Sequence, residues 1–183
     1  MSNGNWSCSE NHLRCWRWLS RHRGDAEWFC LLEDDAIPVT GFRDQLEQAL
    51  EVAPRGIVSL YLGKLRPPQY QHMIQPAIDR AEDHEAHWLV SRQLLHAVGL
   101  AVRGDLLDDM LANLDDETPV DEGIGVWANK HFYRIAYVWP SLIDHADTET
   151  LIAHRDGQHR EPGRVAWKTG TRDFWSYEYV EMN

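Results

Sequence analysis

The chain has 183 residues, a size typical of one domain, and 43% of them are hydrophobic and 26% charged. This composition excludes a mostly disordered protein, and no run of about 18 apolar residues predicts a membrane-spanning helix. The 29 acidic and 18 basic residues give a net charge of −11, which argues against binding of nucleic acid through overall charge. Three cysteines and a polar start without an apolar signal segment predict reduced thiols in a cytoplasmic protein.

Apolar periodicity, caps and prolines predict alternating helices and strands along the chain. Ser7 and Glu10 have the spacing of a capping box, and Thr40 is the expected N-cap of the second helix. The expected helices lie at about 8–20, 41–53, 106–114 and 119–130. The expected strands lie at 28–32, 57–62, 96–102 and 132–139. The polar, proline-containing stretch 64–92 is expected to be a loop or flap.

Strands that alternate with helices predict an α/β fold, with a mostly parallel sheet and helices on both faces. We expect one domain over residues 1–153 and a charged tail over 154–183 that wraps around it. The tail contains basic and histidine side chains that are candidates for contact with a diphosphate, although a solvated tail is the favoured interpretation. These side chains are His154, Arg155, His159, Arg160 and Arg164.

An acidic triplet follows the first expected strand directly, as Glu33, Asp34 and Asp35. Three adjacent carboxylates next to a buried strand repel one another and lose hydration, which is costly unless a cation compensates. In an extended segment, Glu33 and Asp35 would point to one side and Asp34 to the other. Carboxylate oxygens suit Mn²⁺ or Mg²⁺, whereas the alternative interpretation is a solvated acidic turn.

The chain resembles glycosyltransferases of the GT-A fold, and most closely those of glycosyltransferase family 25. Four motifs in the family's order carry this resemblance over roughly residues 7–145. They are Asn11-His12 followed by Trp16, Leu32-Glu33-Asp34-Asp35, Tyr61-Leu62-Gly63, and Val120-Asp121-Glu122. Family members usually begin with a strand–helix–strand unit that holds the nucleotide. This chain starts at the equivalent of the following helix, so we expect an N-terminally short version of the fold.

The resemblance implies a metal site for Mn²⁺ or Mg²⁺. Glu33-Asp34-Asp35 matches the family's variant of the Asp-x-Asp motif, in which Asp35, helped by Glu33, holds an ion that bridges the donor diphosphate. His145 is similar to the C-terminal histidine that completes the metal shell in many such enzymes. A surface histidine is the alternative interpretation of His145.

The resemblance also implies residues for the donor and the acceptor. His96 and Gly99 match a segment that lines the donor sugar, and Asp34 belongs to the same donor site. Asp121 and Glu122 match an acidic pair that supplies the acceptor base, with Asp121 favoured. A partner of the helix dipole is the alternative interpretation of Asp121, because this residue falls in the first turn of an expected helix.

These features predict a metal-dependent enzyme that transfers a hexose from a nucleotide sugar, by resemblance a UDP-sugar, to an acceptor hydroxyl with inversion. The acceptor hydroxyl belongs to a glycan, a protein or another molecule. One alternative is a catalytically impaired remnant of the same fold that binds carbohydrate or protein. Another is a metal-dependent phosphohydrolase built around the acidic triplet.

Overall fold

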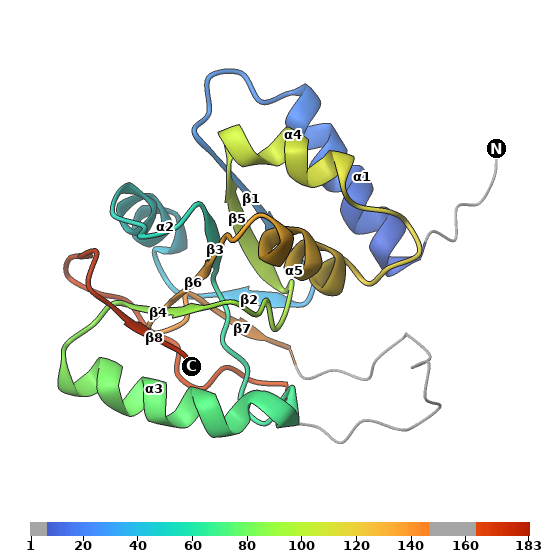
Figure 1. Cartoon of the computed structure of the whole chain (residues 1–183). Coiled ribbons are helices and arrows are strands. Elements are labelled where there is room, and N and C mark those ends of the chain that lie inside the picture. Colours follow the sequence, from blue (N-terminus) through green and yellow to red (C-terminus); the bar gives the residue numbers. More distant parts are fainter. Residues whose placement is uncertain (1–6, 147–163) are drawn as a thin grey trace.

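A computed structural model describes residues 7–146 and 164–183, and these form an α/β structure around a six-stranded mixed sheet (Figure 1). The helices are α1 (Cys8–Arg21), α2 (Phe42–Glu51), the 3₁₀ helix η1 (Pro68–Tyr70), α3 (Gln71–Asp83), α4 (Gly104–Ala112) and α5 (Val120–Lys130). The strands are β1 (Trp28–Leu32), β2 (Ala36–Pro38), β3 (Ile57–Ser59), β4 (Trp88–Ser91), β5 (Gly99–Arg103), β6 (Ile135–Val138), β7 (Ile143–His145) and β8 (Tyr179–Glu181). Among the described residues, no helix is long and apolar enough to cross a membrane.

The large sheet has the strand order β1-β5-β3-β6-β4-β8, and β2 pairs with β7 in a separate two-stranded sheet. Three neighbouring pairs are antiparallel, namely β1–β5, β3–β5 and β4–β6, whereas β3–β6 and β4–β8 are parallel. The prediction of a mostly parallel sheet is therefore wrong. The alternation of helices and strands along the chain does not determine which strands become neighbours. In the structure β5 lies between β1 and β3 and runs opposite to both, and β4, within the stretch expected to be a loop, runs opposite to β6.

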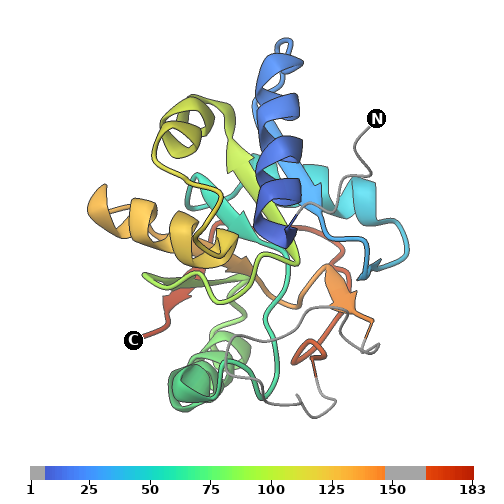
Figure 2. The same cartoon turned by 90° about the vertical axis from the view of Figure 1, so that its right-hand side faces the viewer.

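Helices cover both faces of the sheet, as predicted (Figure 2). Residues that alternate along each strand divide between two hydrophobic clusters. On β3, Ile57 packs in the cluster shared with α1, α3, α4 and α5, whereas Val58 packs in the cluster shared with α2 and Trp175. The continuous apolar runs of the inner strands are explained by this burial on two sides.

The first helix agrees with its expected capping signal, since Ser7 Oγ accepts a hydrogen bond of 3.1 Å from the backbone N–H of Glu10. Thr40 is not the N-cap of α2. That position belongs to Gly41, whose φ of 69° is readily adopted only by glycine, and no side chain caps this helix. The other expected helices appear as α4 and α5, and three of the expected strands appear in shortened form as β3, β5 and β6.

The expected loop at 64–92 instead contains η1, α3 and β4. The apolar residues of α3 recur at helical spacing and are all buried: Ile74, Ala77, Ile78 and Ala81. This pattern indicates an amphipathic helix, but Pro76 within the helix and the polar residues around it argued against one in the sequence.

The final part of the chain adds the edge strand β8, which the sequence did not predict. Before β8, the same segment pairs with the ends of two inner strands. Gly63 bridges Ala166, Ser141 bridges Thr169, and Trp167 N–H donates to the Leu62 carbonyl over 2.9 Å. Of the tail residues considered as diphosphate contacts, only Arg164 belongs to the described structure, and the other four lie outside it.

Candidate functional site

The carboxyl ends of three strands share one edge of the sheet. Both β1 and β3 run antiparallel to β5, and β6 runs parallel to β3, so all three end on the same side. Glu33 follows β1 and Pro140 follows β6, while Gly63 lies beyond β3. In open α/β sheets, ligands bind beyond the carboxyl ends of strands, which makes this edge the candidate site.

The acidic triplet forms a turn and does not continue β1. The Ala36 N–H donates to the Glu33 carbonyl over 3.2 Å, and the Glu33 N–H donates to the Val98 carbonyl over 2.9 Å. The alternation expected for an extended segment therefore does not apply, and Glu33 and Asp35 meet different partners. Asp34 is exposed in the centre of the turn.

Asp35 and His145 come together from distant parts of the sequence. Their atoms Oδ2 and Nε2 lie 3.1 Å apart. The pairing of β2 with β7 positions them, because it sets Ala36 opposite His145, and the Ala146 N–H donates to the Asp35 carbonyl over 2.8 Å. Asp35 Oδ1 and His145 Nδ1 are buried without a hydrogen-bond partner. The sequence predicted both residues, and the fold places them in contact.

Glu33 lies in a crowded acidic environment on the other side of the turn. Burial, together with the negative charges of Asp35, Asp121 and Asp34, raises its pKa to about 7. Its Oε1 lies 4.0 Å from Nε2 of His12 on α1. A carboxyl group that shifts in this direction for these reasons is typical of functional sites.

The two acidic residues at the start of α5 differ in position: Asp121 lies near the acidic triplet, whereas Glu122 is exposed to solvent. Asp121 is partly buried, and burial raises its pKa. Its negative charge also contributes to the raised pKa values of Glu33 and Cys8, so Asp121 lies close to the triplet. Glu122 is exposed.

His96 and Gly99 lie before and at the start of β5. His96 Nε2 is 3.0 Å from the Arg66 carbonyl oxygen, and burial lowers the pKa of this imidazole to about 4. Gly63 makes room for the same ring, since a Cβ atom on Gly63 would lie 2.6 Å from His96 Nε2. The space beside Gly99 is filled by side chains of the core, Ile143 and Leu32. Gly99 thus permits close packing at the end of β1.

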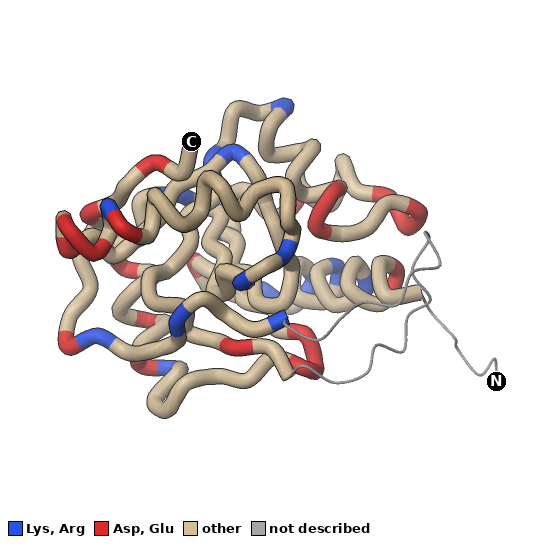
Figure 3. The backbone as a smooth tube through the Cα atoms, turned by 90° about the horizontal axis from the view of Figure 1, so that it is seen from below, with Lys and Arg blue, Asp and Glu red and all other residues tan. Residues whose placement is uncertain are grey.

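The segment after residue 163 packs against the candidate site through hydrogen bonds to residues 64 and 144. Asp144 Oδ1 accepts a 2.7 Å hydrogen bond from the Ala166 N–H, and the Lys64 N–H donates to the Val165 carbonyl over 2.8 Å. Arg164 precedes this anchored stretch, and its positive charge acts to lower the pKa values of both Glu33 and His96. Figure 3 shows acidic residues beside the points where the described chain stops and resumes.

The residues present suit a divalent cation only in part. Within residues 7–146 and 164–183, no group of three His, Cys, Asp or Glu side chains is arranged to hold a metal ion. The contact of 3.1 Å between Asp35 and His145 nevertheless matches two neighbouring ligands of an octahedral ion, which lie about 3 Å apart. The unpartnered Asp35 Oδ1 is a hard oxygen donor. Mg²⁺ commonly takes one or two carboxylates and completes its shell with water and substrate phosphates, so Asp35 and His145 would supply part of the shell of such an ion.

The sequence predicted no site role for His12 or Cys8, although His12 belongs to one of the four motifs. His12 lies on the same face of α1 as Leu13 and Trp16, and all three are buried. A histidine within an apolar helical stripe is the signal that could have identified it. Arg164 was considered as a diphosphate contact within the tail, and the strand pairing that follows it brings it to the site.

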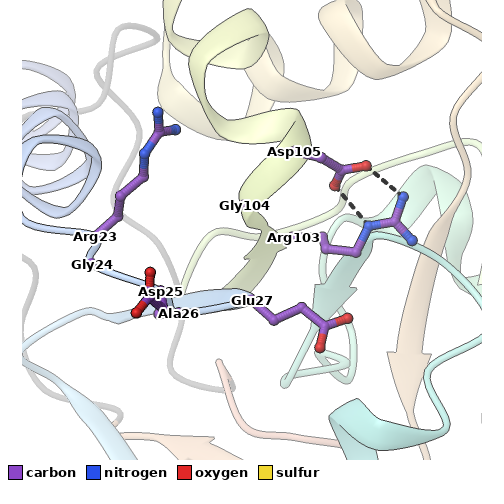
Figure 4. Close-up of a pocket in the computed structure, with 8 residues that line it drawn as sticks. All are labelled: Arg23, Gly24, Asp25, Ala26, Glu27, Arg103, Gly104 and Asp105. Carbon is purple, nitrogen blue, oxygen red and sulfur yellow. Dashed lines mark hydrogen bonds and ion pairs between the residues drawn. The ribbon is translucent and has the colours of Figure 1, made fainter.

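A cavity of about 420 Å³ lies at the opposite, amino end of β1. Arg23, Glu27, Arg103 and Asp105 are among its lining residues, and Arg103 and Asp105 form an ion pair through two hydrogen bonds (Figure 4). None of the predicted site residues lines this cavity. The acidic edge therefore remains the candidate site on chemical grounds.

Comparisons with known proteins give no further guide to this site. The chain matches no protein-family model, and no curated protein matches it.

Proposed function

We propose that the protein is a cytosolic, metal-dependent glycosyltransferase that moves a hexose from a nucleotide sugar, by resemblance a UDP-sugar, to an acceptor hydroxyl. We also propose that its sheet is related to the GT-A fold. One observation carries this proposal: the four motifs of the resemblance lie together in space. His12 lies 4.0 Å from Glu33, the Tyr61 and His145 rings are 6.2 Å apart between centroids, and Asp121 acts on the pKa of Glu33.

Asp35 and His145 are the residues that would hold the metal ion, with Glu33 beside them. A divalent cation, when bound, offsets the negative charge that develops on a departing diphosphate. The protein's own contribution is to fix the two ligands. The β2–β7 pairing orients both side chains, and the burial of the Asp35 Oδ1 atom keeps competing water away from it. The positive charge of Arg164 at the same edge suits an anionic donor.

Asp121 is the proposed general base that takes the proton of the acceptor hydroxyl. Its raised pKa makes it a stronger proton acceptor than an ordinary aspartate, and its charge lies close to Glu33. Glu122 is less suited to this role because it is exposed. A base of this kind contributes about 10²–10⁴-fold to the rate.

Thermal unfolding with UDP and Mn²⁺ tests the donor site. We expect the two together to raise the melting temperature of the wild type, because a ligand at 100 times its Kd adds about 2.7 kcal/mol to stability. Asp35→Asn should abolish this increase. Asp25→Asn is the matched control, since it removes the same charge from an exposed position before the amino end of β1. Turnover is then measured as UDP release from UDP-hexoses in the presence of hydroxyl acceptors.

Two outcomes would replace the proposal with its alternatives. Absence of any UDP effect on the wild type with Mn²⁺ or Mg²⁺ would favour a binding remnant. Cleavage of phosphoesters with Mn²⁺ and without a sugar donor would favour a phosphohydrolase.

A further inference from the structure

His12 is a buried histidine whose ring makes no hydrogen bond of good geometry. It is 5% exposed, and neither Nδ1 nor Nε2 has a well-aligned partner; a looser contact with the Ala97 backbone acts to raise the pKa of the ring, which burial lowers. One turn further along α1, Trp16 is fully buried and its Nε1 is also unpartnered. The two ring centroids are 6.3 Å apart. The buried face of α1 therefore presents several polar atoms with nothing to bind.

Such an arrangement costs folding free energy, because a buried polar group loses its hydration and gains nothing in return. Native proteins satisfy the large majority of these groups, and the exceptions concentrate where a ligand or water supplies the missing partner. A leucine at residue 12 would fill a similar volume on an apolar helix face without this cost. Packing alone therefore does not account for His12.

The gap between His12 and Glu33 has the size of a bridged contact. The distance of 4.0 Å from Nε2 to Oε1 is too long for a direct hydrogen bond. A single oxygen atom between the two groups can bind both at ordinary lengths. An ionised Glu33 only accepts hydrogen bonds. In the tautomer of His12 that carries the proton on Nε2, this nitrogen only donates, and a group between the two must both donate and accept. A hydroxyl does so, whereas a carbonyl oxygen or an ammonium does not.

We propose that His12 and Glu33 together bind a hydroxyl group of the acceptor, and that they hold it beside Asp121. This inference rests on the proposed function and names the acceptor side of that same site. The acidic residues around the gap, Asp34, Asp35 and Asp121, disfavour anionic acceptors, so the chemical class is an uncharged polyol such as a sugar. His12 is then a residue that positions the acceptor, whereas Asp35 and His145 serve the donor.

The substitution His12→Leu tests this assignment at pH 8. We expect UDP and Mn²⁺ to raise the melting temperature of His12→Leu as much as that of the wild type. The KM for a sugar acceptor should rise roughly tenfold or more, the loss expected for about one hydrogen bond, while the KM for the donor stays unchanged. His72→Leu is the matched control, because it makes the same change at an exposed histidine on α3. Unchanged acceptor kinetics in His12→Leu would mean that only an ordered water occupies the gap, and would overturn the proposal.

Unfolding in urea supplies a test that needs no activity. If His12 lacks a partner in the free protein, His12→Leu should unfold at the same or a higher urea concentration than the wild type. A marked fall would show that His12 is a structural residue and would overturn the inference. His12→Gln provides a second variant, which keeps a hydrogen-bond donor at this position and should retain part of the acceptor affinity.

Failure of the proposed function has its own readout, because UDP and Mn²⁺ would then leave the melting temperature of the wild type unchanged. In that case glycerol, an uncharged polyol, is the probe. It should shift the His12 ring signals of ¹⁵N-histidine-labelled wild type by NMR, and unchanged signals would overturn the hydroxyl site itself.

Discussion

Charged residues lie at both ends of β1, but those at the amino end are paired with opposite charges and those at the carboxyl end are mostly acidic. At the amino end, the carboxylate of Asp105 accepts hydrogen bonds of 2.7 and 2.8 Å from the Arg103 guanidinium, which holds the pKa of Asp105 below its usual value. Arg23 likewise pairs with Asp108 at 2.8 Å. Each of these charges has an opposite partner and is exposed to solvent.

At the carboxyl end, carboxylates gather with too few cations. Burial and neighbouring acidic groups raise the pKa of Glu33, and Asp35 keeps an unpartnered oxygen. The cavity of about 420 Å³ lies at the amino end, where Arg103 and Arg23 are already paired with aspartates. The difference teaches that polar groups without partners, more than a neighbouring cavity, mark the carboxyl end of this strand as the candidate site. Four variants test it, and they are ordered from the largest expected effect to the smallest.

The strongest test replaces the proposed base. Asp121→Asn should lower turnover by about 10²–10⁴-fold while leaving UDP and Mn²⁺ binding intact, because the amide cannot accept the acceptor's proton. The measurement is steady-state kinetics alongside thermal unfolding with ligand. Glu27→Gln, at the amino end, is the control that should keep full turnover. An Asp121→Asn enzyme with wild-type turnover would remove Asp121 from catalysis.

A second variant tests the packing that closes the carboxyl end. Gly99→Ala directs a methyl group against Ile143 Cδ1 and to within 3.0 Å of Leu32 Cδ2. Overpacking of this kind should lower the free energy of unfolding by about 1–3 kcal/mol, measured by urea denaturation. Ile143→Val removes the obstructing methyl, so the double variant should recover much of the loss. Additive losses in the double variant would show that the two positions are not coupled.

The pH dependence of the free energy of unfolding tests whether Glu33 at the carboxyl end has a raised pKa. The pKa of Glu33 rises from 4.5 to about 7 on folding. The stability that the protonated Glu33 contributes is therefore fully present below pH 4.5 and is lost as the pH rises through 7. Glu33→Gln removes this loss. In EDTA, the variant should therefore gain about 1–2 kcal/mol over the wild type between pH 5 and pH 8. A constant difference across this range would show that Glu33 titrates normally.

His12 acts in the opposite direction over part of the same range. Burial lowers its pKa from 6.5 to about 4, so its contribution is lost as the pH falls from 6.5 towards 4. The two groups partly offset each other in the wild type, which is why the difference between the variant and the wild type is the informative quantity.

The smallest effect is expected at the amino end. Asp105→Asn weakens an exposed ion pair and should change the free energy of unfolding by less than about 1 kcal/mol. Turnover and UDP binding should stay at wild-type values. A large loss of turnover in this variant would contradict the assignment of function to the carboxyl end alone.

The sequence by itself determined the local features of this protein. The capping box fixed the start of α1, an apolar run marked β1, and the acidic triplet was correctly placed at the end of that strand. These features depend on neighbouring residues, so the chain carries their signal locally. The sequence also proposed Asp35 with His145 and favoured Asp121 over Glu122, and the structure places the preferred residues at one edge.

The tertiary structure alone decided strand direction, the identity of α3 and the partner of each carboxylate. The triplet forms a turn because Ala36 pairs with β7, and this pairing sends Asp35 to His145 and leaves Glu33 facing His12. Contacts between residues far apart in the chain leave no periodic trace in the sequence. The packing of α1 on the sheet buries the nitrogen atoms of His12 without a partner, and this burial cannot be predicted from the sequence alone.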